Sequence, residues 1–398
     1  MLCIEAGRLE GRFPLPPSKP YSQRLLLASA LAEGETVVRG LEWSDDVVAM
    51  VRAIQPIASI TLRGDTAVVS KREPDRYRAF NVMESGFTLR TAVAVYAGIP
   101  GLTAVYFGGT LKGRPIDELV EVLRRLVSVS KLPGAVVIEG RRLGRFRVEI
   151  RADVSSQYIS GLMFLAAAGD GGVVAPRGER KSWSFVEATA EVLRLFGAEV
   201  SIGDEVVVEG GLKSPGTVDV PGDLSLASFL LVASLATGGK VRLEGVVTKL
   251  DAAVLDIFKA MGADIAHGDG YVEARGGFTR GVDVDLGGNP DLVMPVALAA
   301  AMVEEQSAIR GVEHLRFKES DRVATVLDVL GRLGVDARYE GGVLYIKGPP
   351  RRRDVRLSSS GDHRIGLMAM AAAKAVGGCV DDISPVAKSW PSAVLYFK

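Results

Sequence analysis

The segment Asp223–Gly245 reads DLSLASFLLVASLATGGKVRLEG and sets the pattern of the chain. It opens with a polar residue, continues as an apolar run typical of a helix, stops at two glycines and ends in a short strand. This pattern recurs at intervals of roughly 70 residues. The copies begin near Tyr21, Ser85, Ser155, Asp223, Pro290 and Asp362. We therefore predict six repeated modules, each built around an apolar core helix.

A second helix is expected in most copies, after a polar loop and before a pair of strands. The segments that show it are LRLFGAEV (193–200), FKAMGADI (258–265) and LGRLGVDA (330–337). Their apolar spacing predicts amphipathic helices with one buried face, and Gly197, Gly262 and Gly334 stand where such helices stop. Each module should therefore contain a helix, a strand, a second helix and a strand pair.

Two stretches rich in proline and glycine, 14–17 and 214–223, divide the repeats into three and three. This predicts an α/β protein with two similar domains joined by crossings near 14–18 and 214–223. The C-terminal-type domain should contain residues 1–16 and 221–398, and the N-terminal-type domain residues 17–220. Two crossings favour a hinge, and we expect the active site in a cleft between the domains, lined by helix starts.

The composition limits the class of ligand. The chain of 398 residues has 48 basic and 48 acidic residues, so no basic excess favours nucleic acid or a membrane surface. Helix starts gather unpaired N–H groups and the positive end of the helix dipole, so they favour small anions. The three histidines stand in no HxxxH or CxxC context, and no metal is expected. Cys3 and Cys379 are expected to be free thiols in a reducing compartment.

The apolar runs are too short for a membrane span. The longest, such as 292–303, has about a dozen residues where a span needs roughly 20. The N-terminus shows no basic and apolar leader, and we expect a cytoplasmic protein. Only two asparagines, Asn81 and Asn289, occur, which is typical of heat-adapted proteins.

The strongest local motif is RFKESDR at 316–322. Lys318, Glu319 and Arg322 combine a phosphate or hydroxyl donor, a carboxyl acid or base, and a guanidinium suited to a carboxylate. Alone, such a charged helix start is more often a solvated cap. However, further cations stand at matching ends of other repeats, and this favours anion binding. They are Lys19, Arg24, Arg90, Arg114, Arg364 and Lys388.

Neutral donors accompany these cations. Ser155, Ser156, Gln157 and Ser182 suit a phosphate or sugar-like hydroxyls, although ordinary N-capping would also explain them. Asp291 follows Pro290 at a helix opening. It is either a cap or, among so many cations, an ionised base that accepts a proton from a substrate hydroxyl.

Several motifs, read together, resemble one enzyme family along nearly the whole chain. They are PSKPYSQR (17–24), ESGFTLR (84–90), GRPI (113–116), SSQY (155–158), RFKESDR (316–322), GDHR (361–364) and PVAKSWP (385–391). This set resembles the 5-enolpyruvylshikimate-3-phosphate (EPSP) synthases. The resemblance implies a two-domain inside-out α/β barrel. It also implies transfer of the enolpyruvyl group of phosphoenolpyruvate to the 5-hydroxyl of shikimate 3-phosphate, in the shikimate pathway, with no cofactor.

The resemblance also implies a role for each matching residue. Shikimate 3-phosphate would be held by Lys19, Arg24, Ser155, Ser156, Gln157, Ser182, Asp291 and Lys318. Phosphoenolpyruvate would be held by Lys19, Gly86, Arg90, Arg114, Gln157, Arg322, Arg364 and Lys388. Among these, Arg322 and Arg364 would clamp its carboxylate. Asp291 would be the base at the hydroxyl and Glu319 the acid at the methylene carbon, with Lys19 as a further acid near the leaving phosphate. A monomer is expected.

Some positions depart from the family pattern. Pro20 replaces a serine that touches the substrate phosphate, and Phe87, Glu84 and His314 replace a threonine and two asparagines. Thr91 also departs from the usual residue. These changes concern substrate affinity and inhibitor geometry more than the reaction. Gly86 leaves room where glyphosate binds in the family, so we expect glyphosate sensitivity.

Two alternatives stay open at this point. The first is UDP-N-acetylglucosamine enolpyruvyl transferase, which shares the fold and chemistry. That enzyme typically has a cysteine in the loop that here reads GGTLKGRPI (108–116), without one. The second is a non-catalytic RNA-binding relative, which the neutral charge and few aromatic residues disfavour.

Overall fold

The computed structural model describes residues 1–268 and 270–397, which form two compact units. Unit 1 contains Met1–Ser18 and Pro221–Lys398, and unit 2 contains Lys19–Val220. Residues 17 and 18, expected in the N-terminal-type domain, therefore lie in unit 1.

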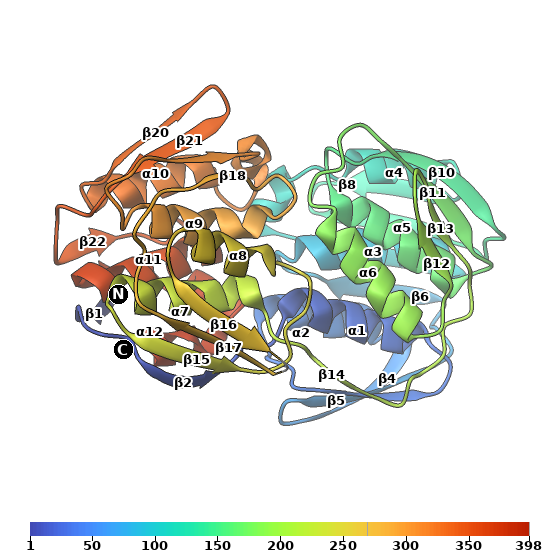
Figure 1. Cartoon of the computed structure of the whole chain (residues 1–398). Coiled ribbons are helices and arrows are strands. Elements are labelled where there is room, and N and C mark those ends of the chain that lie inside the picture. Colours follow the sequence, from blue (N-terminus) through green and yellow to red (C-terminus); the bar gives the residue numbers. More distant parts are fainter. Residues whose placement is uncertain (269, 398) are drawn as a thin grey trace. The chain divides into compact units, whose positions relative to one another are not determined.

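Unit 2 is built from three modules (Figure 1). Its central helices are α1 (Lys19–Leu31), α3 (Gly86–Ala97) and α5 (Ser156–Ala168). Its outer helices are α2 (Asp45–Ile54), η1 (Gly109–Gly113), α4 (Asp117–Arg124) and α6 (Ser184–Leu195). Its strands are β3 (Glu35–Arg39), β4 (Ala58–Arg63), β5 (Thr66–Lys71), β6 (Tyr77–Asn81), β7 (Gly101–Tyr106), β8 (Ser128–Leu132), β9 (Ala135–Gly140), β10 (Phe146–Arg151), β11 (Gly172–Arg177), β12 (Val200–Ile202), β13 (Val206–Val208) and β14 (Thr217–Asp219).

Unit 1 repeats the plan with three further modules (Figure 1). Its central helices are α7 (Leu224–Ala236), α9 (Val293–Ala300) with η2 (Pro290–Leu292) before it, and α11 (His363–Val376). Its other helices are α8 (Ala253–Ala260), η3 (Glu313–Phe317), α10 (Arg322–Arg332), η4 (Ser384–Lys388), η5 (Pro391–Ala393) and α12 (Val394–Phe397). Its strands are β1 (Leu2–Ile4), β2 (Gly11–Pro14), β15 (Lys240–Glu244), β16 (Asp264–Gly268), β17 (Tyr271–Arg275), β18 (Asp283–Asp285), β19 (Ser307–Arg310), β20 (Asp336–Glu340), β21 (Val343–Lys347), β22 (Val355–Leu357) and β23 (Gly378–Val380).

The sheets repeat one strand order, and this confirms the predicted modules. In β6-β7-β9-β8, the strands before and after the central helix pair in parallel, and a hairpin continues the sheet with antiparallel pairing. Sheets β10-β11-β13-β12 and β18-β19-β21-β20 follow the same plan. Sheets β14-β3-β5-β4 and β2-β15-β17-β16 have the same order of pairing, but their first strands are exchanged: β2 precedes α1 yet pairs with β15, and β14 precedes α7 yet pairs with β3. The sixth, β22-β23-β1, has one strand fewer and takes its last strand from the N-terminus.

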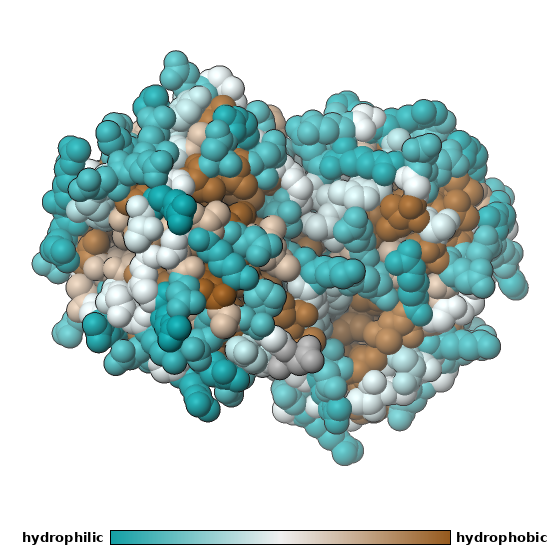
Figure 2. Space-filling model, in the orientation of Figure 1, coloured by the Kyte–Doolittle hydropathy of each residue, from teal (hydrophilic) through white to brown (hydrophobic). Residues whose placement is uncertain are grey.

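The central helices form the cores and the sheets lie outside them. Every residue of α3 is buried, and so is every residue of α7 except its last. The strands instead alternate, as in β3, where buried Thr36 and Val38 lie between more exposed neighbours. Hydrophilic residues accordingly cover much of the face drawn in Figure 2. An apolar helix surrounded by half-exposed strands is the inside-out α/β arrangement that the resemblance implied.

The outer helices stop where the glycines predict. After α6, Gly197 has φ 87°, and the N–H of Ala198 donates to the carbonyl of Leu193 at 3.0 Å. This is the hydrogen bond of a helix that ends in a left-handed residue, a conformation that glycine adopts without steric cost. Gly262 and Gly334 also have positive φ, at 98° and 73°. The same closing turn therefore recurs in both units.

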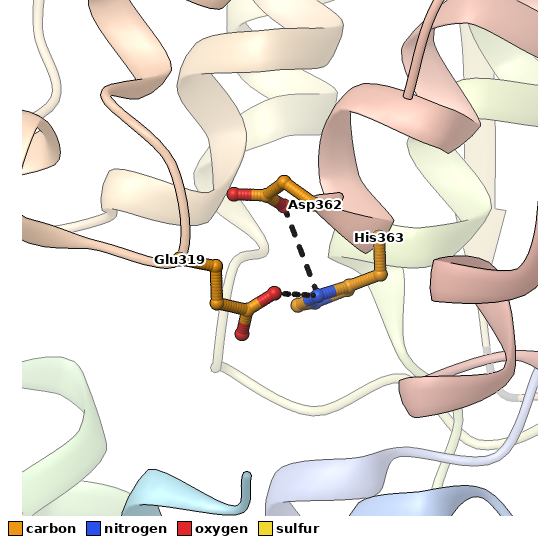
Figure 3. A group of neighbouring side chains, drawn as sticks. All are labelled: Glu319, Asp362 and His363. Atoms are coloured by element: carbon orange, nitrogen blue, oxygen red, sulfur yellow. Dashed lines mark hydrogen bonds and ion pairs between the residues drawn. The ribbon is translucent and has the colours of Figure 1, made fainter. Parts of the chain in front are cut away.

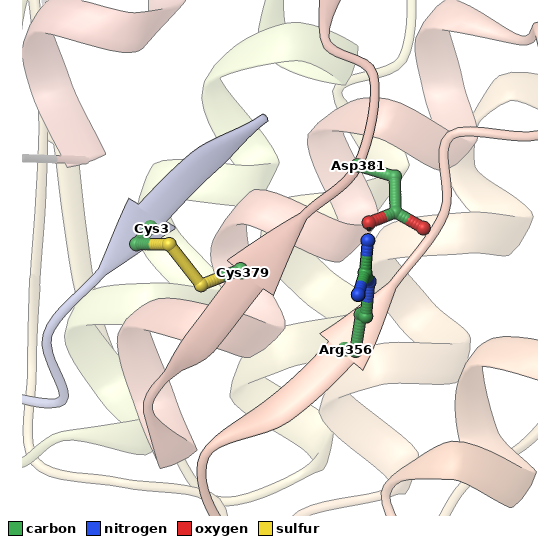
Figure 4. The surroundings of a disulfide bond; sticks show 4 residues. All are labelled: Cys3, Arg356, Cys379 and Asp381. Atoms are coloured by element: carbon green, nitrogen blue, oxygen red, sulfur yellow. Dashed lines mark hydrogen bonds and ion pairs between the residues drawn. A yellow bond between two sulfur atoms is a disulfide. The ribbon is translucent and has the colours of Figure 1, made fainter.

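The expectation of two free thiols is wrong. Cys3 and Cys379 are paired directly across the antiparallel strands β1 and β23 and form a disulfide (Figure 4). Their separation of 376 residues hid this pairing, because no local spacing signals a contact between the two ends of a chain. On the neighbouring β22, Arg356 donates to Asp381 at 2.7 Å. The disulfide thus fixes the N-terminal strand to the last sheet of unit 1.

The apolar core helices do not resemble membrane spans. In the part of the chain that the structure describes, no helix combines the length and apolar character needed to cross a bilayer.

Candidate active site

In unit 1 the predicted site residues lie at the starts of neighbouring helices. Arg322 is the first residue of α10, and Asp291 is the middle residue of η2, directly before α9. Asp362 caps α11, where its carboxylate accepts the backbone N–H of Arg364 at 2.9 Å. Helix α11 packs on α7, α9 and α10, and α9 also packs on α7 and α10. Hydrogen bonds between side chains at the helix starts show that the first turns converge. The fold therefore brings together residues 31 to 73 positions apart in sequence.

Two arginines hold the Asp291 carboxylate between them. Arg322 Nη1 donates to Asp291 Oδ1 at 3.1 Å, and Arg364 Nη2 donates to Asp291 Oδ2 at 2.9 Å. Arg322 also makes two hydrogen bonds to Asp362, from Nε at 2.8 Å and from Nη2 at 3.2 Å. Arg364 Nη1 donates to Ser225 at 2.8 Å. The arginine side chains are almost fully buried, whereas that of Asp291 is 20% exposed.

Glu319 lies beside this network and is held by two further groups. Its Oε2 is 2.8 Å from His363 Nδ1, and its Oε1 is 3.1 Å from Lys388 Nζ. Burial alone would raise the pKa of Glu319. However, the charges of His363, Lys388 and Arg322 outweigh burial and hold this pKa well below the usual value. Glu319 is therefore a carboxylate near neutral pH.

Glu319, Asp362 and His363 offer ligand atoms that all lie within 4.8 Å of one another, as a metal site would require (Figure 3). Yet Lys388 already contacts Glu319, and both oxygens of Asp362 already accept hydrogen bonds from Arg322. A metal ion would have to displace these cations or share their carboxylates. The donor set fits a network of ion pairs better than a metal centre.

Unit 2 gathers a second predicted set around Gly86. Arg90 Nη1 donates to the Gly86 carbonyl at 3.0 Å and to Gln157 Oε1 at 3.1 Å, and its Nη2 donates to the carbonyl of Pro115 at 2.6 Å. A Cβ atom on Gly86 would lie 2.7 Å from Arg90 and 2.9 Å from Arg114. Burial, and then the charge of Arg114, lowers the pKa of Arg90 to about 10. Two cations therefore converge where only glycine leaves space.

Lys19, at the start of α1, forms an ion pair with Asp46, with Nζ and Oδ2 3.0 Å apart. Both side chains are nearly buried. Gln23, one turn later on α1, donates to the carbonyl of Asp46 and to the hydroxyls of Ser85 and Thr88, over 3.0–3.1 Å. Gln23 thereby connects the start of α1 with the start of α3, which carries Gly86.

The guanidinium of Arg24 is held by hydrogen bonds to a hydroxyl and two backbone carbonyls. Its Nε donates to Thr189 at 2.8 Å, its Nη1 to the carbonyl of Pro20 at 2.8 Å, and its Nη2 to the carbonyl of Phe185 at 3.0 Å. The Phe87 ring lies under the guanidinium, 4.3 Å away, which is a cation–π contact. Burial lowers the pKa of Arg24 to about 9. Two of the unusual positions, Pro20 and Phe87, thus contact this arginine directly.

The predicted serines occupy capping and turn positions. Ser155 caps α5, and its hydroxyl accepts the N–H of Gln157 at 3.3 Å, so the simple capping role does apply. Ser156 follows as the first, buried residue of α5. Ser182 is nearly buried and has φ 53°, a left-handed conformation that is uncommon for serine. Strained residues of this kind concentrate at functional sites.

The sequence interpretation missed some members of these clusters. His363 and Asp362 stand inside the quoted GDHR motif but were assigned no role, and Asp46 belongs to no quoted motif. Their contacts with Glu319, Arg322 and Lys19 span 27 to 44 positions, so no local spacing reveals them. Lys318 lies directly after η3, next to Glu319. The structure thus groups one predicted set in unit 1 and another in unit 2.

Comparison with known proteins identifies the family. The family model for EPSP synthase (3-phosphoshikimate 1-carboxyvinyltransferase) matches residues 4–394. The chain belongs to the EPSP synthase family. The 3-phosphoshikimate 1-carboxyvinyltransferase of Korarchaeum cryptofilum is 32% identical over 98% of this chain and 96% of its own. The enzyme of that name from Thermococcus kodakarensis is 35% identical over 98% of this chain and 97% of its own.

A solved structure supports the same architecture. The structure of EPSP synthase from Acinetobacter baumannii matches 99% of this chain and 96% of its own, with a TM-score of 0.84 and 24% identity. Membership of the EPSP synthase family confirms the resemblance read from the seven motifs. It does not favour UDP-N-acetylglucosamine enolpyruvyl transferase or the RNA-binding relative.

Proposed function

We propose that this chain transfers the enolpyruvyl group of phosphoenolpyruvate to the 5-hydroxyl of shikimate 3-phosphate, releasing phosphate. The relatives named above carry this activity in their names. One observation within the chain supports it most. A partly exposed carboxylate, Asp291, lies between two buried arginines, and a second carboxylate, Glu319, lies beside them. This arrangement places possible acid and base groups next to cations that suit an anionic substrate.

The residues are assigned to the two substrates as the family pattern implies. For shikimate 3-phosphate they are Lys19, Arg24, Ser155, Ser156, Gln157, Ser182, Asp291 and Lys318. For phosphoenolpyruvate they are Lys19, Gly86, Arg90, Arg114, Gln157, Arg322, Arg364 and Lys388. The pairing of Arg322 and Arg364 around one carboxylate, that of Asp291, supports their role as a carboxylate clamp. The convergence of Arg90 and Arg114 at Gly86 supports a site for the phosphate end.

The first half of the proposed reaction is an addition. Asp291 accepts the proton of the 5-hydroxyl. At the same time the oxygen of that hydroxyl forms a bond to the central carbon of phosphoenolpyruvate. The methylene carbon takes a proton and becomes a methyl group, which gives a tetrahedral intermediate. Because Glu319 is a carboxylate in the resting arrangement, its proton must be supplied. His363, with Nδ1 2.8 Å from Glu319 Oε2, is placed to supply it.

The second half is an elimination. The methyl group returns a proton to Glu319, the carbon–oxygen bond to phosphate breaks, and the double bond of the enolpyruvyl group reforms. Lys19 would protonate the leaving phosphate, and its ion pair with Asp46 fixes the ammonium group before the substrate arrives. The cations of both sets offset the repulsion between two strongly anionic substrates.

We further propose that the protein acts as a monomer in the cytoplasm and binds neither nucleic acid nor membranes. The balanced charge of 48 basic and 48 acidic residues supports the last two points. The disulfide does not oppose a cytoplasmic location in a heat-adapted organism, because intracellular proteins of such organisms are often rich in disulfides.

The test is release of phosphate from phosphoenolpyruvate in the presence of shikimate 3-phosphate and, separately, of UDP-N-acetylglucosamine. We expect phosphate release in the reaction with shikimate 3-phosphate and none in the reaction with UDP-N-acetylglucosamine. Mass spectrometry should detect the enolpyruvyl ether product of the first reaction. Release with the nucleotide sugar alone would replace the proposal by its first alternative. Release with neither would refute enolpyruvyl transfer to either acceptor.

A further inference from the structure

Asp251 of unit 1 is a buried acidic residue that the proposed reaction does not use. It lies in the turn before α8 and is only 2% exposed. Its φ of 60° is in the left-handed region, which aspartate enters more readily than most residues but still at a cost. A buried carboxyl group in a strained backbone conformation persists only where its surroundings hold it.

The side chain of Asn289 connects Asp251 to Asp291. Asn289 Nδ2 donates to Asp251 Oδ1 at 3.2 Å. The backbone carbonyl of Asn289 accepts the N–H of Leu292 at 3.0 Å and so closes η2, the turn that carries Asp291. Anything that moves the Asn289 side chain therefore acts on the turn that orients the Asp291 carboxylate.

The charged groups that act on Asp251 come from three other elements. They are Asp291 on η2, Asp223 at the start of α7 and Arg364 on α11. Burial, then the charges of Asp291 and Asp223, raise the pKa of Asp251 to about 7, although Arg364 and the Asn289 hydrogen bond oppose this. Asp223 Oδ2 is buried and has no hydrogen-bond partner among the described residues. A proton on Asp251 would remove its repulsion with Asp291 and Asp223.

We infer that Asp251 is a positioning residue that holds Asp291 in place through the Asn289 amide. In its protonated form, Asp251 still accepts the hydrogen bond from Asn289. Because it is then neutral, it does not compete with Asp291 and the substrate carboxylate for the positive charge of Arg364. In its ionised form, it adds a negative charge near Arg364 and weakens the attraction for the phosphoenolpyruvate carboxylate. The part that concerns this substrate rests on the proposed function.

The experiment compares the pH dependence of turnover in the wild type and in Asp251→Asn. In the wild type, kcat/KM for phosphoenolpyruvate should fall several-fold as the pH rises through about 7. Asp251→Asn keeps an acceptor for Asn289 and cannot ionise, so this fall should disappear while kcat at pH 6 stays within about threefold. Asp256→Asn is the matched control, because Asp256 lies on α8 with its side chain 83% exposed. Its pH profile should match that of the wild type.

Two further variants test the route through Asn289. Asp251→Leu and Asn289→Leu each break the hydrogen bond and should each lower kcat about tenfold. The double variant should lose no more than either single variant, because both changes remove one interaction. If the loss of kcat in the double variant equals the product of the two single losses, the proposed route is wrong. A wild-type kcat in Asn289→Leu would also overturn it. Identical pH profiles for the wild type and Asp251→Asn would overturn the role of ionisation.

An assay without turnover separates this inference from the proposed function. Denaturant unfolding between pH 4 and pH 8 reports protonation of Asp251 whatever the substrate. The folded-state pKa is above the unfolded value, so wild-type stability should fall relative to Asp251→Asn as the pH rises from about 4 to about 7. If this difference appears but turnover is absent, the proposed function fails and the protonation of Asp251 stands. If the difference is absent, the inference fails even in an active enzyme.

Discussion

The buried arginines among the predicted site residues have different partners in the two units. In unit 1, Arg322 and Arg364 are bound to the carboxylates of Asp291 and Asp362. In unit 2, the hydrogen bonds of Arg24 and Arg90 go to carbonyls, a hydroxyl and an amide, which are neutral. Burial lowers the pKa of both unit 2 arginines, since nothing in those hydrogen bonds offsets their charge.

This difference separates two kinds of task. A buried cation with neutral partners gains most when an anionic ligand arrives, so unit 2 is suited to binding. A cation that shares carboxylates sets their basicity and position, so unit 1 is suited to proton transfer. Lys19 differs from Arg24 and Arg90, since it is paired with the carboxylate of Asp46. The comparison predicts that loss of the unit 1 carboxylate of Asp291 affects mainly kcat, whereas disruption around Arg90 in unit 2 affects mainly KM.

The largest effect is expected for Asp291→Asn in unit 1. The amide cannot accept the proton of the substrate hydroxyl, and it leaves Arg322 and Arg364 without a shared carboxylate. Loss of a general base lowers kcat by about 10²–10⁴-fold. Steady-state kinetics should show this loss, whereas the control Asp328→Asn, on the surface of α10, should match the wild type. A kcat within tenfold of the wild type would remove Asp291 from the role of base.

The second prediction concerns stability and is confined to unit 1. Replacing Cys3 by serine removes the disulfide, and the free energy of unfolding should fall by about 2–5 kcal/mol. Native-state hydrogen exchange should show the loss in β1, β22 and β23, with little change in the sheets of unit 2. Equal loss of protection in both units would show that the two units unfold together.

The third prediction tests the binding role of unit 2. In Gly86→Ala the new methyl group would lie within 3 Å of the guanidinium groups of Arg90 and Arg114. Arg90 is fixed by three hydrogen bonds, so the displacement should raise KM for phosphoenolpyruvate about 10- to 100-fold and change kcat less. Gly144→Ala is the control, because nothing lies within 4 Å of its added carbon. A loss confined to kcat would contradict the division of tasks.

The smallest effect is expected from the pH dependence of stability at Glu319. Its folded-state pKa is below the ordinary value of 4.5, so its ion pairs stabilise the fold above that pH and lose this contribution as the pH falls through the folded-state pKa. In Glu319→Gln this contribution is absent. The free energy of unfolding of the wild type should therefore exceed that of the variant at pH 6 and converge with it in acid. Parallel unfolding curves at all pH values would show that Glu319 gains nothing from His363 and Lys388.

The sequence predicted the repeated modules because each helix start carries its own local pattern. The buried helices and the strands that follow them, such as α7 and β15, were readable from apolar runs and glycine stops. The contact partners of the site residues could not be predicted from the sequence. Asp46, His363 and Asp251 act through contacts with residues 27 to 44 positions away, which only the packing of modules creates. The Cys3–Cys379 pair is the extreme case, since it joins strands from opposite ends of the chain.

Unit 1 is formed by two separate stretches of the chain, and this has a consequence for how it folds during translation. Its first two strands, β1 and β2, leave the ribosome before any residue of unit 2, yet the partner of β1 among the described strands is β23, at residues 378–380. Unit 2 is continuous and can complete its three sheets while translation proceeds. Strand β2 can pair with β15 once residues 241–244 have been made, but β1 must wait until residues 378–380 have been made. A circular permutant that begins at Pro221 and joins the old C-terminus to Met1 would produce unit 1 without interruption, and its refolding should be faster.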